Sequence, residues 1–94
     1  MISGFKKIDA FVAVVESGSF EGASIRLNVT ASAVSLRVRS LEIELGFKLI
    51  TRKRPCELTA AGASIYRHAL QLQEIKTNMQ KALAPFLVTP DKGA

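Results

Sequence analysis

The sequence predicts a small, mainly α-helical domain that ends in one long helix. Apolar residues recur at spacings of three and four in four separate segments, the pattern of helices with one buried face. Residues that begin or end helices separate these segments. Residues 47–58 lack the helical spacing and indicate a short hairpin instead. The length of 94 residues fits a single domain of this kind.

The first helix is predicted over residues 5–16 and the second over a short segment that follows it. Gly18 can adopt the left-handed backbone that ends a helix, and Ser19 is a good N-cap for the next one. The second helix ends near Asn28, a residue that tolerates a left-handed turn. The inward-facing residues of these two helices are Phe5, Ile8, Phe11, Val12 and Val15, then Phe20, Ala23 and Leu27.

The third helix is predicted over Ala31–Leu45, with Thr30 as its N-cap and Gly46 after its end. Its apolar face and its opposite face are clearly divided. The apolar face holds Val34, Val38, Leu41 and Leu45, and the opposite face holds Ser32, Leu36, Arg39 and Ile43, with Ser35 beside them.

The hairpin is predicted to pair a strand at residues 49–50 with a possible return strand at residues 56–58, around a tip at residues 53–55. Thr59 then caps the last helix, which we expect to end just before Pro85 because proline removes a helical hydrogen bond. Residues 60–84 would form a helix about 37 Å long. The tail, residues 88–94, resembles a frayed linker.

Composition narrows the function. No apolar run approaches the roughly 20 residues that span a bilayer, the first residues lack the apolar region of a signal peptide, and a single cysteine fits the reducing cytoplasm. An enzyme with its own substrate cleft is not expected at this size, and no catalytic arrangement is present. His68 and Cys56 are too few for a metal site, and no cofactor motif occurs.

Only residues 28–30 separate the second and third helices, which makes this pair a helix-turn-helix candidate. In such a motif the first helix braces the second so that one face can enter a major groove about 12 Å wide. The pattern alone leaves open an ordinary helical hairpin with a solvated face.

The distribution of charge favours a nucleic acid partner. Seven basic and two acidic residues lie between Arg26 and Arg54, so this stretch holds the whole formal charge of +5. The basic residues of the predicted tip, beside Pro55, suit a narrow minor groove. A solvated basic loop is the alternative for the tip.

The long helix carries a heptad pattern typical of a two-helix interface. Its predicted interface residues are Ile65, Leu72, Ile75, Met79 and Ala82. One side of this helix could instead pack on the first helix, and both arrangements can hold together. We expect self-association, because DNA-binding proteins of this kind often dimerise and place their two recognition helices about 34 Å apart, one turn of the duplex.

The motifs together resemble a known family. The segment GSF before the second helix, VTASAVS at the third, the pattern LE...LG...L..R and the continuation ELTAAG are similar to the N-terminal winged helix-turn-helix and linker helix of LysR-type transcriptional regulators. The resemblance covers about residues 5–87. RPCELTAAG and RHALQ are similar to the branch that governs basic amino-acid export.

The resemblance implies a dimer, often a dimer of dimers, on an interrupted dyad of double-stranded DNA. It implies major-groove contacts from Ala31, Ser32, Ser35 and Leu36, a minor-groove contact from Arg54, and phosphate contacts near Thr30, Arg37 and Thr59. We add the basic residues Arg39, Arg52 and Lys53 to this DNA-binding set.

Two departures from the family limit what can be carried over. Leu36 stands where relatives place Gln or Arg, and leucine can pack on a thymine methyl but cannot hydrogen-bond a base. Family members also continue into an effector-binding domain, so we expect no ligand sensing by the present residues.

We therefore expect a DNA-binding domain at residues 1–58, a dimerisation helix at 59–87 and a flexible tail at 88–94, in a cytoplasmic, nucleoid-associated regulator without a membrane partner. The alternative is a winged-helix protein-interaction module that uses the long helix, to which exposed Leu36 and Ile43 would lend support.

Overall fold

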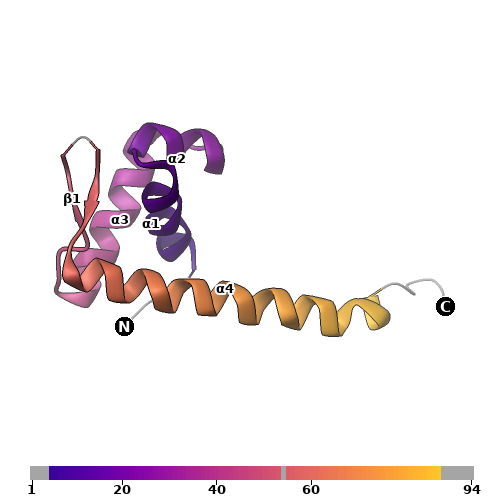
Figure 1. The fold of residues 1–94 in the computed structure, drawn as a ribbon. Helices are drawn as coiled ribbons and strands as arrows, with labels where there is room; N and C mark the ends of the chain where they lie inside the picture. Colours follow the sequence, from indigo (N-terminus) through magenta and orange to yellow (C-terminus); the bar gives the residue numbers. More distant parts are fainter. Residues whose placement is uncertain (1–4, 54, 88–94) are drawn as a thin grey trace.

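A computed structural model of the chain describes residues 5–53 and 55–87. Three short helices and a two-stranded hairpin form a compact head, and a long helix extends from it (Figure 1). The dimensions of 53 × 25 × 20 Å reflect this extension. The elements are α1 (Lys6–Ser17), α2 (Phe20–Leu27), α3 (Ala31–Leu45), β1 (Ile50–Thr51), β2 (Glu57–Leu58) and α4 (Ala60–Leu87).

The predicted breaks between the first three helices are confirmed by the backbone. Gly18, Asn28 and Gly46 follow α1, α2 and α3 with φ of 82°, 58° and 82°, the left-handed conformation that ends helices. The Ser19 hydroxyl accepts a hydrogen bond from the Gly22 N–H at 2.9 Å. The Thr30 hydroxyl accepts one from the Ala33 N–H at 3.0 Å, so both predicted N-caps form.

The core of the head lies where α1 packs against α2 and α3. α1 supplies the largest share of the buried residues because two of its faces are covered. The largest fully buried side chains are Phe11, Val12, Val14, Val34, Val38, Leu41, Leu49 and Ile50. This core fixes the angle between α2 and α3 and therefore the direction of α3.

The hairpin is shorter and begins later than predicted. Ile50 pairs with Leu58 and Thr51 with Glu57 in antiparallel register. Leu49 is buried just ahead of β1 rather than inside it, since its N–H donates to the Glu42 side chain and its carbonyl accepts from the Thr59 N–H. We call β1, β2 and the residues between them the wing.

Thr59 joins the wing to α4. Its hydroxyl donates to the Lys48 carbonyl at 2.6 Å and accepts from the Gly62 N–H at 3.0 Å. Gly62 is buried against the chain at Leu49, and a Cβ on Gly62 would overlap the Leu49 carbonyl oxygen. The first turn of α4 is therefore built into the head rather than attached as a separate rod.

The prediction that the last helix ends before Pro85 is wrong, because α4 continues to Leu87 with Pro85 inside it. Pro85 lacks the N–H that would bond the Lys81 carbonyl. Both residues are exposed, so water can reach that carbonyl and the cost is small near the helix end. Phe86 therefore belongs to α4, where it is exposed.

Among residues 5–53 and 55–87, no helix combines the length and the apolar character that a membrane span requires. The predicted tail, residues 88–94, lies outside the described residues.

Candidate nucleic-acid interface

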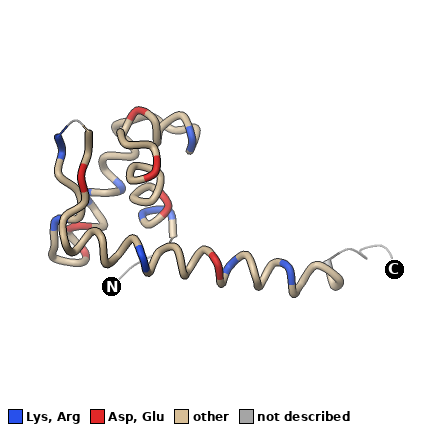
Figure 2. Tube along the Cα trace, viewed as in Figure 1, with Lys and Arg blue, Asp and Glu red and all other residues tan. Residues whose placement is uncertain are grey.

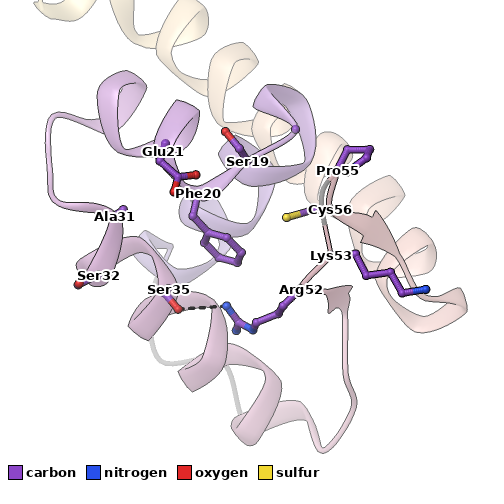
Figure 3. Close-up of a pocket in the computed structure, with 11 residues that line it drawn as sticks. Ser19, Phe20, Glu21, Ala31, Ser32, Ser35, Arg52, Lys53, Pro55 and Cys56 are labelled. Atoms are coloured by element: carbon purple, nitrogen blue, oxygen red, sulfur yellow. Dashed lines mark hydrogen bonds between the residues drawn. The ribbon is translucent and has the colours of Figure 1, made fainter.

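A groove of about 490 Å³ separates the start of α2, the start of α3 and the wing (Figure 3). We call it the head groove. It is lined by Gly18, Ser19, Phe20, Glu21, Ala31, Ser32, Ser35, Arg52, Lys53, Pro55 and Cys56. The structure thus brings together five predicted DNA-binding residues from two segments that are about 20 positions apart in the chain.

The α3 side of the head groove consists of small residues. Ala31, Ser32 and Ser35 occupy its first two turns, where a short side chain lets another molecule approach the helix closely. Ser32 is exposed and Ser35 half-buried. Leu36, one residue further on, is 67% exposed and lies outside the groove lining.

The wing side of the head groove is dominated by Arg52. Its Nη1 donates to the Ser35 hydroxyl at 3.0 Å, and its Nη2 lies 3.5 Å from Oε1 of Glu42. The guanidinium carbon lies 4.8 Å from the centre of the Phe20 ring, a cation–π distance. Figure 3 shows the Arg52 side chain directed across the groove toward α3.

Glu42 is buried, with 7% of its surface exposed. Its Oε2 accepts from the N–H groups of Leu49 and Ile50 at 2.8 and 3.3 Å. Its other oxygen faces Arg52. The carboxylate therefore joins α3 to the base of the wing and satisfies both backbone donors.

Sequence reasoning missed the role of Glu42, which counted only as an acidic residue among basic ones. A signal was present, since Glu42 lies four residues after Val38 and three before Leu45, within the apolar face of α3. Phe20 was expected to face inward, and it packs partly on the core while also lining the head groove.

Those of the other predicted DNA-binding residues that the structure describes lie outside the head groove. Arg37 is half-buried and Arg39 is exposed beside Phe47 and Lys48. The Thr59 hydroxyl proton is donated to the Lys48 carbonyl, while the Thr30 hydroxyl acts as an acceptor in its N-cap. Arg54 lies outside the described residues.

The basic stretch is less uniform in space than in sequence. Arg26 forms an ion pair with Glu16 at 2.6 Å, and Arg52 is held by Glu42. Figure 2 shows Lys and Arg at the wing and also at separate places along the helices. The exposed cation that lines the head groove without a described ion pair is Lys53.

α4 divides into a part within the head and a part beyond it. Ala69 is buried and Ile65 packs partly on the core of its own chain, whereas Leu72, Ile75 and Met79 are 39%, 55% and 58% exposed. The predicted interface residue Ala82 is also exposed.

A second groove, of about 380 Å³, lies between α4 and the start of α1. It is lined by Phe5, Ile8, Asp9, Ala69, Leu72, Gln73, Ile75, Lys76 and Met79.

The chain has one histidine and one cysteine. His68 is exposed on α4, where its Nδ1 lies 2.7 Å from the Ser64 carbonyl, and Cys56 is a half-buried free thiol packed against the core. In the described part of the chain no three His, Cys, Asp or Glu side chains cluster to hold a metal ion.

The tri-helical head, the wing and the small-residue start of α3 define a winged helix-turn-helix protein, as the sequence predicted. Residues 5–63 match the family model of the bacterial regulatory helix-turn-helix proteins of the lysR family, and the chain belongs to this family.

Relatives and solved structures agree with this assignment. The transcriptional regulator LysG of Mycobacterium tuberculosis is 49% identical over 65 residues, which are 69% of this chain and 22% of LysG. The lysine export transcriptional regulatory protein LysG of Corynebacterium glutamicum is 34% identical over 87 residues, 88% of this chain and 30% of that protein. These names match the resemblance to the basic amino-acid export branch.

Full-length LysG of Corynebacterium glutamicum superposes with a TM-score of 0.85 at 31% identity, over 92% of this chain and 30% of that one. The DNA-binding domain of BenM, solved in complex with catB site 1 DNA, gives a TM-score of 0.85 at 30% identity, over 90% of this chain and 97% of that one. The chain thus spans less than a third of its full-length relatives and nearly all of an isolated DNA-binding domain.

Proposed function

We propose that this chain is the DNA-binding part of a LysR-family transcriptional regulator, which binds an interrupted dyad in double-stranded DNA as a homodimer. α3 enters the major groove and the wing reaches the adjacent minor groove. A tetramer forms when the remainder of a full-length regulator is present, and the complex works at the nucleoid in the cytoplasm. No catalytic role is proposed.

The head groove carries this proposal. Small side chains at the start of α3 lie opposite cationic side chains of the wing. A DNA duplex in this groove would approach the α3 backbone closely and contact the basic wing at the same time. The similarity to a DNA-binding domain solved on DNA supports DNA as the partner. Arg54 retains its proposed minor-groove contact, and Thr30 and Arg37 their proposed phosphate contacts.

Residues 1–58 would supply the DNA contacts and residues 59–87 the dimer, with 88–94 as a tail. The names of the relatives further support a role in basic amino-acid export. The target genes would then encode a transport function.

The proposal is tested by titrating the chain onto a dyad-containing duplex and a scrambled duplex over a range of salt concentrations. A clear preference for the dyad is expected. The logarithm of the binding constant should fall by about 0.9 per neutralised phosphate for each tenfold rise in salt concentration. Equal affinity for both duplexes would leave non-specific binding. Absence of binding would favour the alternative protein-interaction module.

A matched pair of variants locates the surface. Lys53→Ala removes a charge from the head groove, and Lys81→Ala removes one from an exposed position far along α4. Lys53→Ala should lower affinity and reduce the salt slope by about 0.9 per subunit, or about two units for the dimer, whereas Lys81→Ala should change neither. The reverse result would place the DNA on α4.

A further inference from the structure

We infer that the Ser35 hydroxyl donates a hydrogen bond to a base, because its oxygen already accepts a hydrogen bond from Arg52. Arg52 is then a positioning residue for base readout rather than a phosphate ligand. This inference rests on the proposed function and adds to it the chemical class of base edge that α3 selects.

The position of Arg52 is determined by three groups of the protein itself. These are the Ser35 hydroxyl at 3.0 Å, the Glu42 carboxylate at 3.5 Å and the Phe20 ring at 4.8 Å. They come from α2 and from two different turns of α3. Although Arg52 stands at the surface, only 30% of its side chain is exposed. A guanidinium engaged in this way is not free to follow a phosphate.

The Glu42 carboxylate holds its place independently of Arg52. Two backbone N–H groups, of Leu49 and Ile50, bind its Oε2, and the residue is 7% exposed. Its second oxygen is therefore a fixed, buried negative charge facing Arg52. The attraction keeps the guanidinium beside Ser35 in the absence of any ligand.

The direction of the Ser35 hydrogen bond follows from chemistry. Arginine has five N–H donors and no acceptor, so the Ser35 oxygen must accept from it. In the described part of the chain this is the hydrogen bond that the Ser35 side chain makes, so the hydroxyl proton remains available in the head groove. A hydroxyl that accepts from a cation becomes a stronger donor and a weaker acceptor.

The neighbouring positive charge acts in the same direction. It attracts the acceptor atoms of the major-groove edge, which are N7 and O6 of guanine, N7 of adenine and O4 of thymine. It repels the amino group that cytosine presents there. A serine without such a partner can pair with either kind of edge, so Arg52 converts an ambiguous hydroxyl into a selective one.

The test selects duplexes from a pool randomised across the dyad, using the wild-type chain and the variants Ser35→Ala, Arg52→Met and Arg52→Lys. We expect one position in each half-site where the wild type disfavours cytosine about tenfold. Ser35→Ala and Arg52→Met should lose this preference at that same position, and the double variant should lose no more than either. Arg52→Lys should restore part of it, and circular dichroism verifies folding.

Other outcomes would overturn the inference. If Arg52→Met weakens all sequences equally and lowers the salt slope by about 0.9 per subunit, Arg52 binds a phosphate. If Ser35→Ala leaves every preference unchanged, Ser35 does not contact bases. A wild-type chain without any sequence preference would instead refute the proposed function itself, so the two failures are distinguishable.

Discussion

The Glu42 carboxylate on α3 accepts a hydrogen bond from the Leu49 N–H at 2.8 Å, across the junction between this helix and the wing. Ile50 N–H donates to the same oxygen at 3.3 Å. Gly46 turns the chain between these residues, with φ of 82°. Glu42 therefore joins α3 directly to the start of the wing, whose two-residue strands offer few hydrogen bonds of their own.

Removal of this carboxylate should destabilise the head. Glu42→Ala leaves two buried N–H donors unpaired, and we expect a loss of about 3 kcal/mol in the free energy of unfolding. Glu42→Gln keeps one acceptor and should lose about 1–2 kcal/mol. Urea unfolding measures both. The control is Glu44→Gln on the same helix, which breaks a partly exposed ion pair with Lys7 and should lose less than about 1 kcal/mol. Equal losses at the two positions would contradict the proposed role of Glu42.

Gly62 gives a second test of the packing. Replacing a glycine inside a helix by alanine normally stabilises the helix by about 1 kcal/mol. Gly62→Ala should instead destabilise the chain by about 1–3 kcal/mol, because the added Cβ would overlap the Leu49 carbonyl and press on the Leu58 side chain. Thermal unfolding measures the effect. A stabilised variant would mean that the start of α4 can move away from the wing at no cost.

The sequence allowed the helices to be placed well because their ends are encoded locally. Ser19 and Thr30 cap, and Gly18, Asn28 and Gly46 adopt left-handed backbone, all within a few residues of the helix that they bound. The start of α4 at Thr59 follows the same logic.

What the sequence did not disclose depends on contacts between distant residues. Periodicity could place Glu42 on the apolar face of α3, but not show that its partners would be backbone groups seven and eight positions later. The contact of Arg52 with Ser35 spans 17 positions and gives no local signal. The end of α4 was mispredicted for the opposite reason, since a local rule about Pro85 does not apply strictly in an exposed last turn.

Stability should depend on pH through Glu16, which connects three helices. The Arg26 guanidinium, by its hydrogen bond, holds the pKa of this carboxyl below its usual 4.5; burial opposes this shift, and the hydrogen bond from Tyr66 adds to it. A carboxyl with a lowered pKa in the folded state stabilises the fold fully above pH 4.5, and this contribution is lost as the pH falls through the folded-state pKa. Urea unfolding between pH 3 and 7 should show a shallower acid loss for Glu16→Gln, while Glu74→Gln on exposed α4 should resemble the wild type. Identical curves for Glu16→Gln and the wild type would contradict the linkage.

The alkaline side has the opposite sign. The hydrogen bond to Glu16 raises the pKa of the Tyr66 hydroxyl above its usual 10.0, with burial acting in the same direction. The folded state then retains a proton that the unfolded state releases, so stability should fall as the pH rises past 10. Tyr66→Phe should abolish this part of the decline, measured by unfolding between pH 8 and 11. An unchanged decline would assign it to other groups.

Leu36 should contribute an apolar contact to base recognition. It is 67% exposed near the start of α3 and has no hydrogen-bonding group. If it packs on a thymine methyl, replacing that thymine by uracil should weaken binding by the wild type about fourfold, the equivalent of one buried methyl. Leu36→Ala should bind both duplexes equally. If no such replacement changes the affinity of the wild-type chain, Leu36 does not contact a thymine methyl.

The exposed apolar residues of α4 carry the last prediction. The helix extends beyond the head (Figure 1), and Leu72, Ile75 and Met79 on it are 39%, 55% and 58% exposed. A second copy laid on this seam would bury them together with the groove beside α1. Leu72→Glu should therefore dissociate the dimer, since it places a charge in the buried seam. Thr77→Glu adds the same charge at an exposed position about 140° around the helix and should remain dimeric. Sedimentation of both variants distinguishes the cases, and a dimeric Leu72→Glu chain would mean that the interface lies elsewhere. Because two half-sites must be read at once, the same substitution should also reduce preference for the dyad while leaving binding to a single half-site unchanged.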